Sequence, residues 1–185
     1  YMIDGLEMFG FPYATGDDVR SSPAVADLDK NNSLELIIGS HDGSLHIISG
    51  FGQQLATHQV NGSINGSPAA VDLDQDGDLE VVFTSYNGGT GDVHAIHHNG
   101  STFYGFPVYL NEKMVGGAAA GDLDGDGYPE IVVCTDDDNV YAIKKDGSIM
   151  SGFPFTSTDR FFNAPTLVDI DGDTDLEIVV GNRRG

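Results

Sequence analysis

The nine-residue stretch Asp72-Leu-Asp-Gln-Asp-Gly-Asp-Leu-Glu80 decides the fold, because similar stretches begin at residues 27, 122 and 169. In every copy, oxygen-bearing side chains stand at positions 1, 3 and 5, and a glutamate stands at position 9. An apolar run typical of a β-strand follows each glutamate, as in Val81-Val-Phe83. The sequence therefore predicts four acidic loops, at residues 27–35, 72–80, 122–130 and 169–177, each leading into a strand.

The spacing of these oxygens is typical of a loop that binds a hard cation. Ca²⁺ takes about 6–8 oxygen ligands from carboxylates, carbonyls and water. Position 7 differs in every copy, so we expect its backbone carbonyl to be the ligand there. Without a cation, so many carboxylates in one short loop would repel one another. The sequence predicts about four Ca²⁺ per chain, held by Asp27, Asp29, Asn31, Ser33, Glu35, Asp72, Asp74, Asp76, Asp78, Glu80, Asp122, Asp124, Asp126, Tyr128, Glu130, Asp169, Asp171, Asp173, Asp175 and Glu177.

The loops begin like the calcium loop of an EF-hand, and that class of site is excluded. An EF-hand needs a glutamate at position 12 and a helix on either side of the loop. Position 12 is apolar in all four copies, where it is Ile38, Phe83, Val133 and Val180. A strand, not a helix, is expected after each loop.

The charge of the chain is dominated by these loops. The formal net charge is -21, and 17 of the 29 acidic residues lie in the four loops. Four bound Ca²⁺ would bring the charge to about -13. A surface that is still acidic argues against nucleic acid or an anionic membrane as a partner. No apolar run approaches the ~20 residues that a membrane span requires. Cys134 is the only cysteine, so no internal disulfide can form, and we predict that it is a core residue.

The chain repeats with a period typical of a propeller blade. The four loops start 45, 50 and 47 residues apart. A Gly-Phe-Pro marker precedes three of them, at residues 10–12, 105–107 and 152–154, and Leu55-Ala-Thr57 is its degenerate form. The pattern of each repeat predicts four strands. A first strand of small residues leads through the acidic loop into a second strand that is buried on both faces. A third strand follows, and the fourth strand lies at the marker.

We therefore predict an all-β fold, a β-propeller of four-stranded blades with calcium loops between the first and second strands. A solenoid of stacked repeats is the alternative. Residues 1–185 form a single propeller domain or a fragment of a larger propeller. Residues 1–3 align with a third strand and residues 4–12 with a fourth, whereas the chain stops after a second strand. The two ends would thus supply one blade split between the termini.

These motifs resemble the FG-GAP and VCBS-type repeats of integrin α-chain propellers and bacterial secreted proteins. The resemblance covers nearly the whole chain. It implies that positions 1, 3, 5 and 9 bind calcium through side chains and position 7 through its carbonyl. The first repeat departs from the pattern with Asn31 and Ser33, and propellers of this family usually have more than the four repeats present here.

The sequence favours an extracellular, non-catalytic module for adhesion, recognition or structure. Its expected partners are a protein or glycan bound through hairpin tips, and flanking repeats if the parent chain is longer. The alternative is part of a propeller enzyme such as a polysaccharide lyase or quinone-dependent dehydrogenase. The only catalytic candidates outside the loops are histidines, among which His94 and His98 are expected on one strand face and His97 on the other. We therefore predict that the protein is not an enzyme.

Overall fold

The computed structural model describes residues 4–184, which form β-strands and connecting turns without a helix that could cross a membrane. The first sheet contains β1 (Ala24–Ala26), β2 (Glu35–Gly39), β3 (Ser44–Ser49) and β4 (Gln54–Gln59). The second contains β5 (Ala69–Val71), β6 (Glu80–Asn87), β7 (Thr90–Ile96) and β8 (Val108–Glu112). The third contains β9 (Ala119–Gly121), β10 (Glu130–Cys134), β11 (Asn139–Ile143) and β12 (Phe155–Thr156), and the fourth contains β13 (Thr166–Val168) and β14 (Glu177–Val179).

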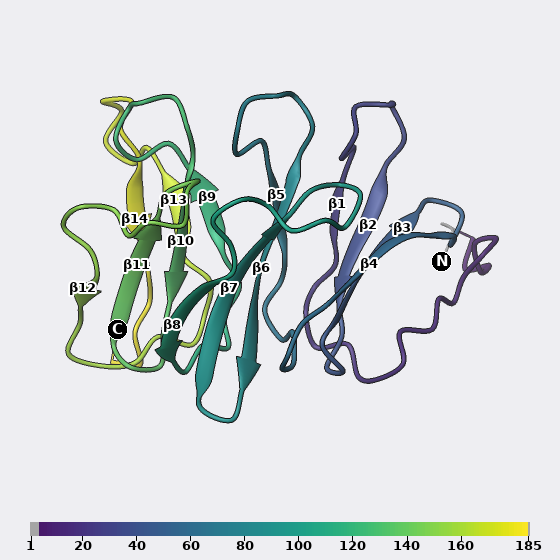
Figure 1. The fold of residues 1–185 in the computed structure, drawn as a ribbon, viewed down its shortest axis with the longest axis horizontal. Helices are drawn as coiled ribbons and strands as arrows, with labels where there is room; N and C mark the ends of the chain where they lie inside the picture. Colours follow the sequence, from purple (N-terminus) through teal and green to yellow (C-terminus); the bar gives the residue numbers. More distant parts are fainter. Residues whose placement is uncertain (1–3, 185) are drawn as a thin grey trace.

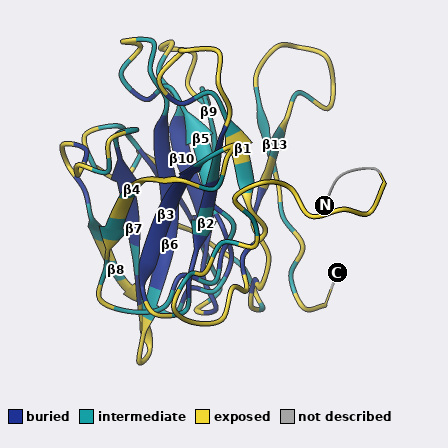
Figure 2. Ribbon diagram, turned by 90° about the vertical axis from the view of Figure 1, so that its right-hand side faces the viewer, coloured by how far each residue is buried: buried dark blue, intermediate teal, exposed yellow. Residues whose placement is uncertain are grey.

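Each sheet is an antiparallel meander in chain order, which confirms the predicted four-stranded repeat in the first three sheets. The sheets stand side by side in a row (Figure 1). In the view turned by 90°, β1 and β13 lie toward one side of the molecule, whereas β4 and β8 lie toward the other (Figure 2). The first strands are thus the inner strands of a propeller-type arrangement, and each acidic loop joins an inner strand to its second strand.

The hydrophobic core consists of three layers, one between each pair of neighbouring sheets. Along β6, Val81 and Phe83 pack toward the first sheet, whereas Val82 packs toward the third. Because side chains alternate between the two faces of a strand, burial on both faces requires a continuous apolar run. This confirms the predicted double burial for β6 and β10. The same prediction is wrong for β2 and β14. Burial alternates along β2, and Val179 of β14 is 45% exposed, because in the described residues each of these sheets has a neighbouring sheet on only one side.

The inner strands approach one another so closely that small residues are required. A Cβ atom at Gly117 would lie 2.5 Å from the carbonyl oxygen of Ser67 in the neighbouring repeat. One at Gly66 would lie 2.4 Å from the carbonyl oxygen of Gly116. Real Cβ atoms do not approach backbone atoms so closely. The predicted crowding of small first strands is confirmed, which favours the propeller over the solenoid.

The Gly-Phe-Pro markers were expected in fourth strands, and that expectation is wrong. Gly105-Phe106-Pro107 and Gly152-Phe153-Pro154 form the turns before β8 and β12, with cis Phe–Pro peptide bonds. Only the degenerate Leu55–Thr57 lies inside a strand, β4. The difference follows from chemistry, because proline has no N–H to donate to a neighbouring strand.

The blade expected to be split between the termini is not assembled in the described residues. β13 and β14 form a two-stranded sheet, and residues 4–23 contain no strand. The predicted third strand, at residues 1–3, lies outside the described residues. Residues 4–12 lie at one end of the row of sheets and the sheet of β13 and β14 lies at the other (Figure 1), so the three four-stranded sheets stand between the halves of this blade.

Candidate metal centre

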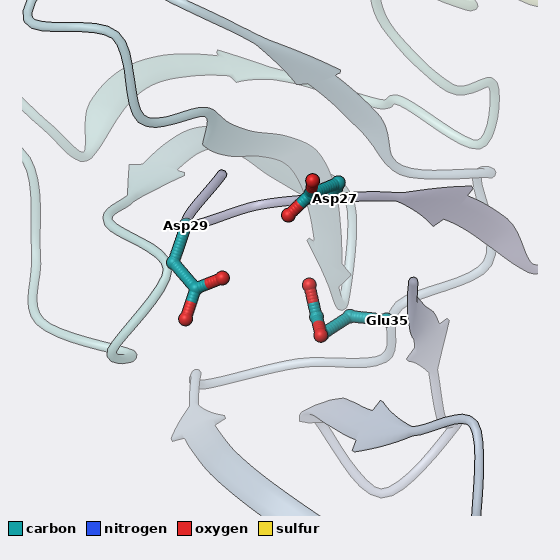
Figure 3. A group of neighbouring side chains, drawn as sticks. All are labelled: Asp27, Asp29 and Glu35. Carbon is teal, nitrogen blue, oxygen red and sulfur yellow. The ribbon is translucent and has the colours of Figure 1, made fainter. Parts of the chain in front are cut away.

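Each predicted loop gathers three carboxylates, at positions 1, 3 and 9, around one point. One oxygen from each residue of a triad lies within 4.8 Å of the others. Figure 3 shows the first triad, in which the carboxylates of Asp27, Asp29 and Glu35 converge. The remaining triads are Asp72, Asp74 and Glu80, then Asp122, Asp124 and Glu130, then Asp169, Asp171 and Glu177. The spacing arises because the loop reverses direction between the two strands and brings position 9 back to position 1.

The four loops share one backbone conformation despite different residues. Positions 4 and 6 have positive φ in every copy, although several of these residues are not glycine. Left-handed backbone is costly for most residues other than glycine. Its recurrence at the same two positions of every loop therefore indicates a conformation that the site requires. The residues are Lys30 and Asn32, Gln75 and Gly77, Gly125 and Gly127, and Gly172 and Thr174, with φ between 54° and 104°.

The same hydrogen bonds recur in all four loops. The backbone N–H of position 2 donates to Oε2 of the position 9 glutamate, at 3.0 Å from Leu28 to Glu35 and 2.9 Å from Ile170 to Glu177. Leu73 and Leu123 donate in the same way to their glutamates. The N–H of position 7 donates to the side-chain oxygen of position 5, at 2.7 Å from Ser33 to Asn31. The equivalent pairs are Asp78 with Asp76, Tyr128 with Asp126, and Asp175 with Asp173.

In the second and third sites, burial disfavours the charged form of the glutamate side chains. The Glu80 and Glu130 side chains are buried, and burial raises the pKa of both carboxyl groups. The Asp72 Oδ1 atom is also buried and accepts no hydrogen bond. A buried acceptor without a donor is costly, and a buried carboxylate is stabilised by a nearby cation. The residues present therefore fit a metal ion bound at the centre of the loop.

Nitrogen-bearing side chains reach two sites from the residues that follow β7 and β11. His97 Nδ1 lies 3.0 Å from Glu80 Oε1, and His98 Nδ1 lies 3.3 Å from Asp78 Oδ2. Lys144 Nζ lies 2.6 Å from Asp124 Oδ2 and 3.9 Å from Glu130 Oε1. The Lys144 ammonium lowers the pKa of Asp124.

These neighbours of the loops were not predicted from the sequence. The signal was available, because the register of paired strands places the residue at or just after the end of the third strand opposite position 9. In the first sheet, this register pairs Ser49 with Glu35. His97 and Lys144 hold the same place in the second and third sheets.

The expectation that His94 and His98 share one exposed face is wrong. β7 ends at Ile96, so the alternation of side chains does not continue to His97 and His98. His94 is buried between the first two sheets, where its ring stacks on Phe83 with centroids 4.9 Å apart. His97 and His98 instead contact the second acidic loop.

Solved structures with a similar fold include three propeller-type proteins. The computationally designed Ika4 protein has a TM-score of 0.65 and 14% identity, over 98% of this chain and 94% of that one. Bap1, a biofilm matrix protein of V. cholerae, has a TM-score of 0.61 and 24% identity, over 88% of this chain and 28% of Bap1. BamB from Moraxella catarrhalis has a TM-score of 0.60 and 17% identity, over 85% of this chain and 43% of BamB. These similarities show a shared fold.

Similarity in sequence is more specific than this similarity in fold. No curated protein matches the chain. The FG-GAP-like repeat matches at residues 72–133 and again at residues 122–180, which together make up more than half of the chain. Both matches begin at the first aspartate of an acidic loop and end in or just after the second strand of the next repeat. The chain belongs to the FG-GAP-like repeat family.

Proposed function

We propose that the protein is a calcium-binding, extracellular β-propeller module with a non-catalytic role in adhesion or recognition. The observation that carries this proposal is the fourfold recurrence of one loop, with a carboxylate triad, a shared backbone conformation and the same two hydrogen bonds. The donors are all oxygen, as Ca²⁺ prefers, and most come from one short segment. When bound, the ion would supply positive charge to the buried carboxylates and tie the inner strand to the second strand.

Support for an extracellular location is of two kinds. Calcium loops of extracellular modules bind in the ~10⁻⁴–10⁻³ M class, which suits the calcium concentration outside cells. Bap1, which shares the fold, is a biofilm matrix protein. We infer that this chain is likewise secreted or displayed at a surface, and that the first loop, with Asn31 in place of an aspartate, is among the weakest sites.

Recognition is proposed to involve the turns at the outer edges of the sheets. The Tyr104 side chain, in the turn before β8, is 84% exposed. Exposed aromatic rings offer large contact areas at low entropic cost and suit protein or glycan ligands. A non-catalytic role is supported by the histidines, because His94 packs in the core and His97 contacts a loop carboxylate. The propeller-enzyme alternative has no comparable support among the described contacts.

Calorimetric titration of the chelator-treated chain tests the calcium sites. We expect about four sites in the wild type and one fewer in Asp74→Asn, because the amide removes a charged ligand from the second triad. Tyr128→Ser should leave the number of sites unchanged, because position 7 contributes its carbonyl.

The matched control is Asp17→Asn, which removes an exposed carboxylate outside the loops. It should bind calcium like the wild type. No calcium-dependent heat in the wild type would rule out the proposed sites, and equal losses from Tyr128→Ser and Asp74→Asn would show that position 7 does not act through its backbone.

A further inference from the structure

Hydrogen bonds join the first three acidic loops to one another. The loops lie along one edge of the row of sheets (Figure 1), so each loop has the next as its neighbour. The first loop is joined to the second through backbone groups, and the second is joined to the third through a side chain. Both links end at residues that stand next to the proposed ion ligands, so the sites are not structurally independent.

The link between the first and second loops is made by the backbone. The N–H of Leu79, at position 8 of the second loop, donates to the carbonyl oxygen of Leu28, at position 2 of the first, at 2.8 Å. The peptide group that contains this N–H also contains the carbonyl of Asp78, which is the proposed position 7 ligand. The Leu28 N–H in turn donates to Glu35 Oε2 at 3.0 Å. The link thus runs from a ligand of the second site to the residue that holds a ligand of the first.

The link between the second and third loops is made by a side chain. Position 8 of the third loop is Pro129, which has no N–H to donate. Instead, Gln75, at position 4 of the second loop, donates from Nε2 to the carbonyl oxygen of Gly127, at position 6 of the third. The peptide group that contains this carbonyl also contains the N–H of Tyr128, which donates to Asp126 Oδ1 at 2.8 Å. The link therefore ends at the peptide group that holds a ligand of the third site.

Positions 4 and 6 of neighbouring loops also meet in the first pair. Lys30, at position 4 of the first loop, lies against Gly77, at position 6 of the second, where a Cβ atom would lie 2.7 Å from Lys30 Nζ. The third and fourth loops differ. Position 4 of the third loop is Gly125, which has no side chain, and no hydrogen bond joins these two loops within residues 4–184. The fourth loop therefore serves as an internal comparison.

The Gln75 link depends on the conformation of both loops that it joins. Gln75 and Gly127 are the two kinds of position with positive φ, and each stands beside a proposed position 5 ligand. The carboxylates of an empty loop repel one another, so a bound ion holds the loop in its shape, together with the donor or acceptor that the loop carries. The neighbouring loop then loses less conformational freedom when it binds its own ion.

We propose that the Gln75 side chain couples the second and third ion sites, so that an ion in either loop raises the affinity of the other. The inference rests on the proposed calcium sites and adds a connection between two of them. Coupling between two sites is reciprocal, so each ion changes the affinity of the other by the same factor. A single hydrogen bond corresponds to a factor of roughly two to ten.

Terbium luminescence measures the third site separately, because Tyr128 is the only tyrosine in the four loops. Tb³⁺ takes oxygen ligands as Ca²⁺ does, and it emits when a nearby tyrosine absorbs light and transfers the energy. The part of the emission that disappears in Tyr128→Phe reports the third site. Titration with Tb³⁺ then gives the affinity of this site in any variant.

Four proteins form the test: the wild type, Asp74→Asn, Gln75→Met and the variant with both changes. Methionine keeps the length of the glutamine side chain without an N–H, and Gln75 is exposed, so the fold is retained. Asp74→Asn should weaken the third site by a factor that is roughly two to ten times larger with Gln75 in place than in the Gln75→Met background. Repulsion between bound cations, and the charge that Asp74→Asn removes, act in both backgrounds and cancel in this comparison.

Two controls complete the experiment. Gln53→Met replaces an exposed glutamine outside the loops and should behave like the wild type. Asp171→Asn removes the equivalent ligand from the fourth loop, and its effect on the third site should not depend on Gln75. If it does depend on Gln75, this side chain acts on the third site alone and the proposal is wrong. An equal effect of Asp74→Asn in both backgrounds overturns the coupling and leaves the ion sites standing, whereas a lack of emission through Tyr128 overturns the third site and the coupling with it.

Discussion

Lys144 places an ammonium group among the ligands of the third loop. Its Nζ atom lies 2.6 Å from Asp124 Oδ2 and 3.7 Å from Asp126 Oδ2. Calcium has to displace or repel this cation in order to reach the same oxygens. Lys144→Met should therefore raise the calcium affinity of the third site roughly two- to tenfold, an effect that salt will reduce. Titration calorimetry measures the change.

Lys145 provides the control for this prediction. It carries the same charge on the next residue, but its Nζ atom lies over the Tyr128 ring at 3.0 Å from the centroid. Lys145→Met should change calcium affinity much less than Lys144→Met. If the two variants bind calcium with equal affinity, net charge explains the effect and the position of Lys144 does not.

His94 is the buried histidine most sensitive to acid. Burial, together with the smaller effect of the neighbouring His58, lowers the pKa of His94 to about 4. An unfolded histidine has a pKa of about 6.5. As the pH falls from 6.5 toward 4, the unfolded chain takes up a proton at this residue, and the folded chain does not. Folding therefore loses stability across this window, by about 2 kcal/mol at pH 5.

Urea unfolding at pH 8 and pH 5, at one fixed calcium concentration, measures this contribution. His94→Gln should show a smaller loss of stability between the two pH values than the wild type, whatever its stability at pH 8. Gln53→Ala alters an exposed side chain that does not titrate and should keep the wild-type pH dependence. Equal pH dependence in all three proteins would show that His94 does not contribute.

At the level of the strands, the close approach of β5 and β9 limits what the inner strands tolerate. Gly117 leads into β9, and a Cβ there would meet the backbone of Ser67 at 2.5 Å. Gly117→Ala should destabilise the fold by about 1–3 kcal/mol, because backbone on both sides has to move. Gly181→Ala is the control, since a Cβ at that glycine meets nothing within 4 Å. Chemical denaturation of the two variants should separate them clearly.

The sequence predicted the strands that local chemistry determines. Val81-Val-Phe83 and Ile131-Val-Val133 are apolar at every position, a pattern typical of burial on both faces. The acidic loops were predictable because their oxygens lie within nine residues of one another. The place of Gly105-Phe106-Pro107 was not predictable in this way. Its position in the repeat suggested a fourth strand, whereas the exclusion of proline from strand interiors suggests a turn before that strand. His97 was misplaced for a related reason, since the end of β7 depends on pairing with β6.

On the scale of the whole molecule, the arrangement of the sheets in a row could not be predicted from the sequence. Local patterns specify each sheet and its two faces, but they do not say how the sheets are placed relative to one another. The same patterns do predict the distribution of charge. Four loops carrying 17 acidic residues lie on the connections between inner and second strands, so repulsion is concentrated where the sheets converge.

Calcium is therefore expected to act on the stability of the whole chain. A ligand that binds only the folded state stabilises it by RT ln(1 + [L]/Kd) for each site, about 1.4 kcal/mol at tenfold excess. Four sites would contribute roughly 5–6 kcal/mol, which is comparable to the entire stability of an ordinary domain. Thermal unfolding followed by circular dichroism should show a melting temperature well above that in EGTA when millimolar Ca²⁺ is present. Magnesium at the same concentration should have a smaller effect, because Mg²⁺ demands near-octahedral geometry and gives up its water reluctantly. Coincident curves with and without calcium, in a protein shown by calorimetry to bind the ion, would mean that the loops do not hold the sheets together.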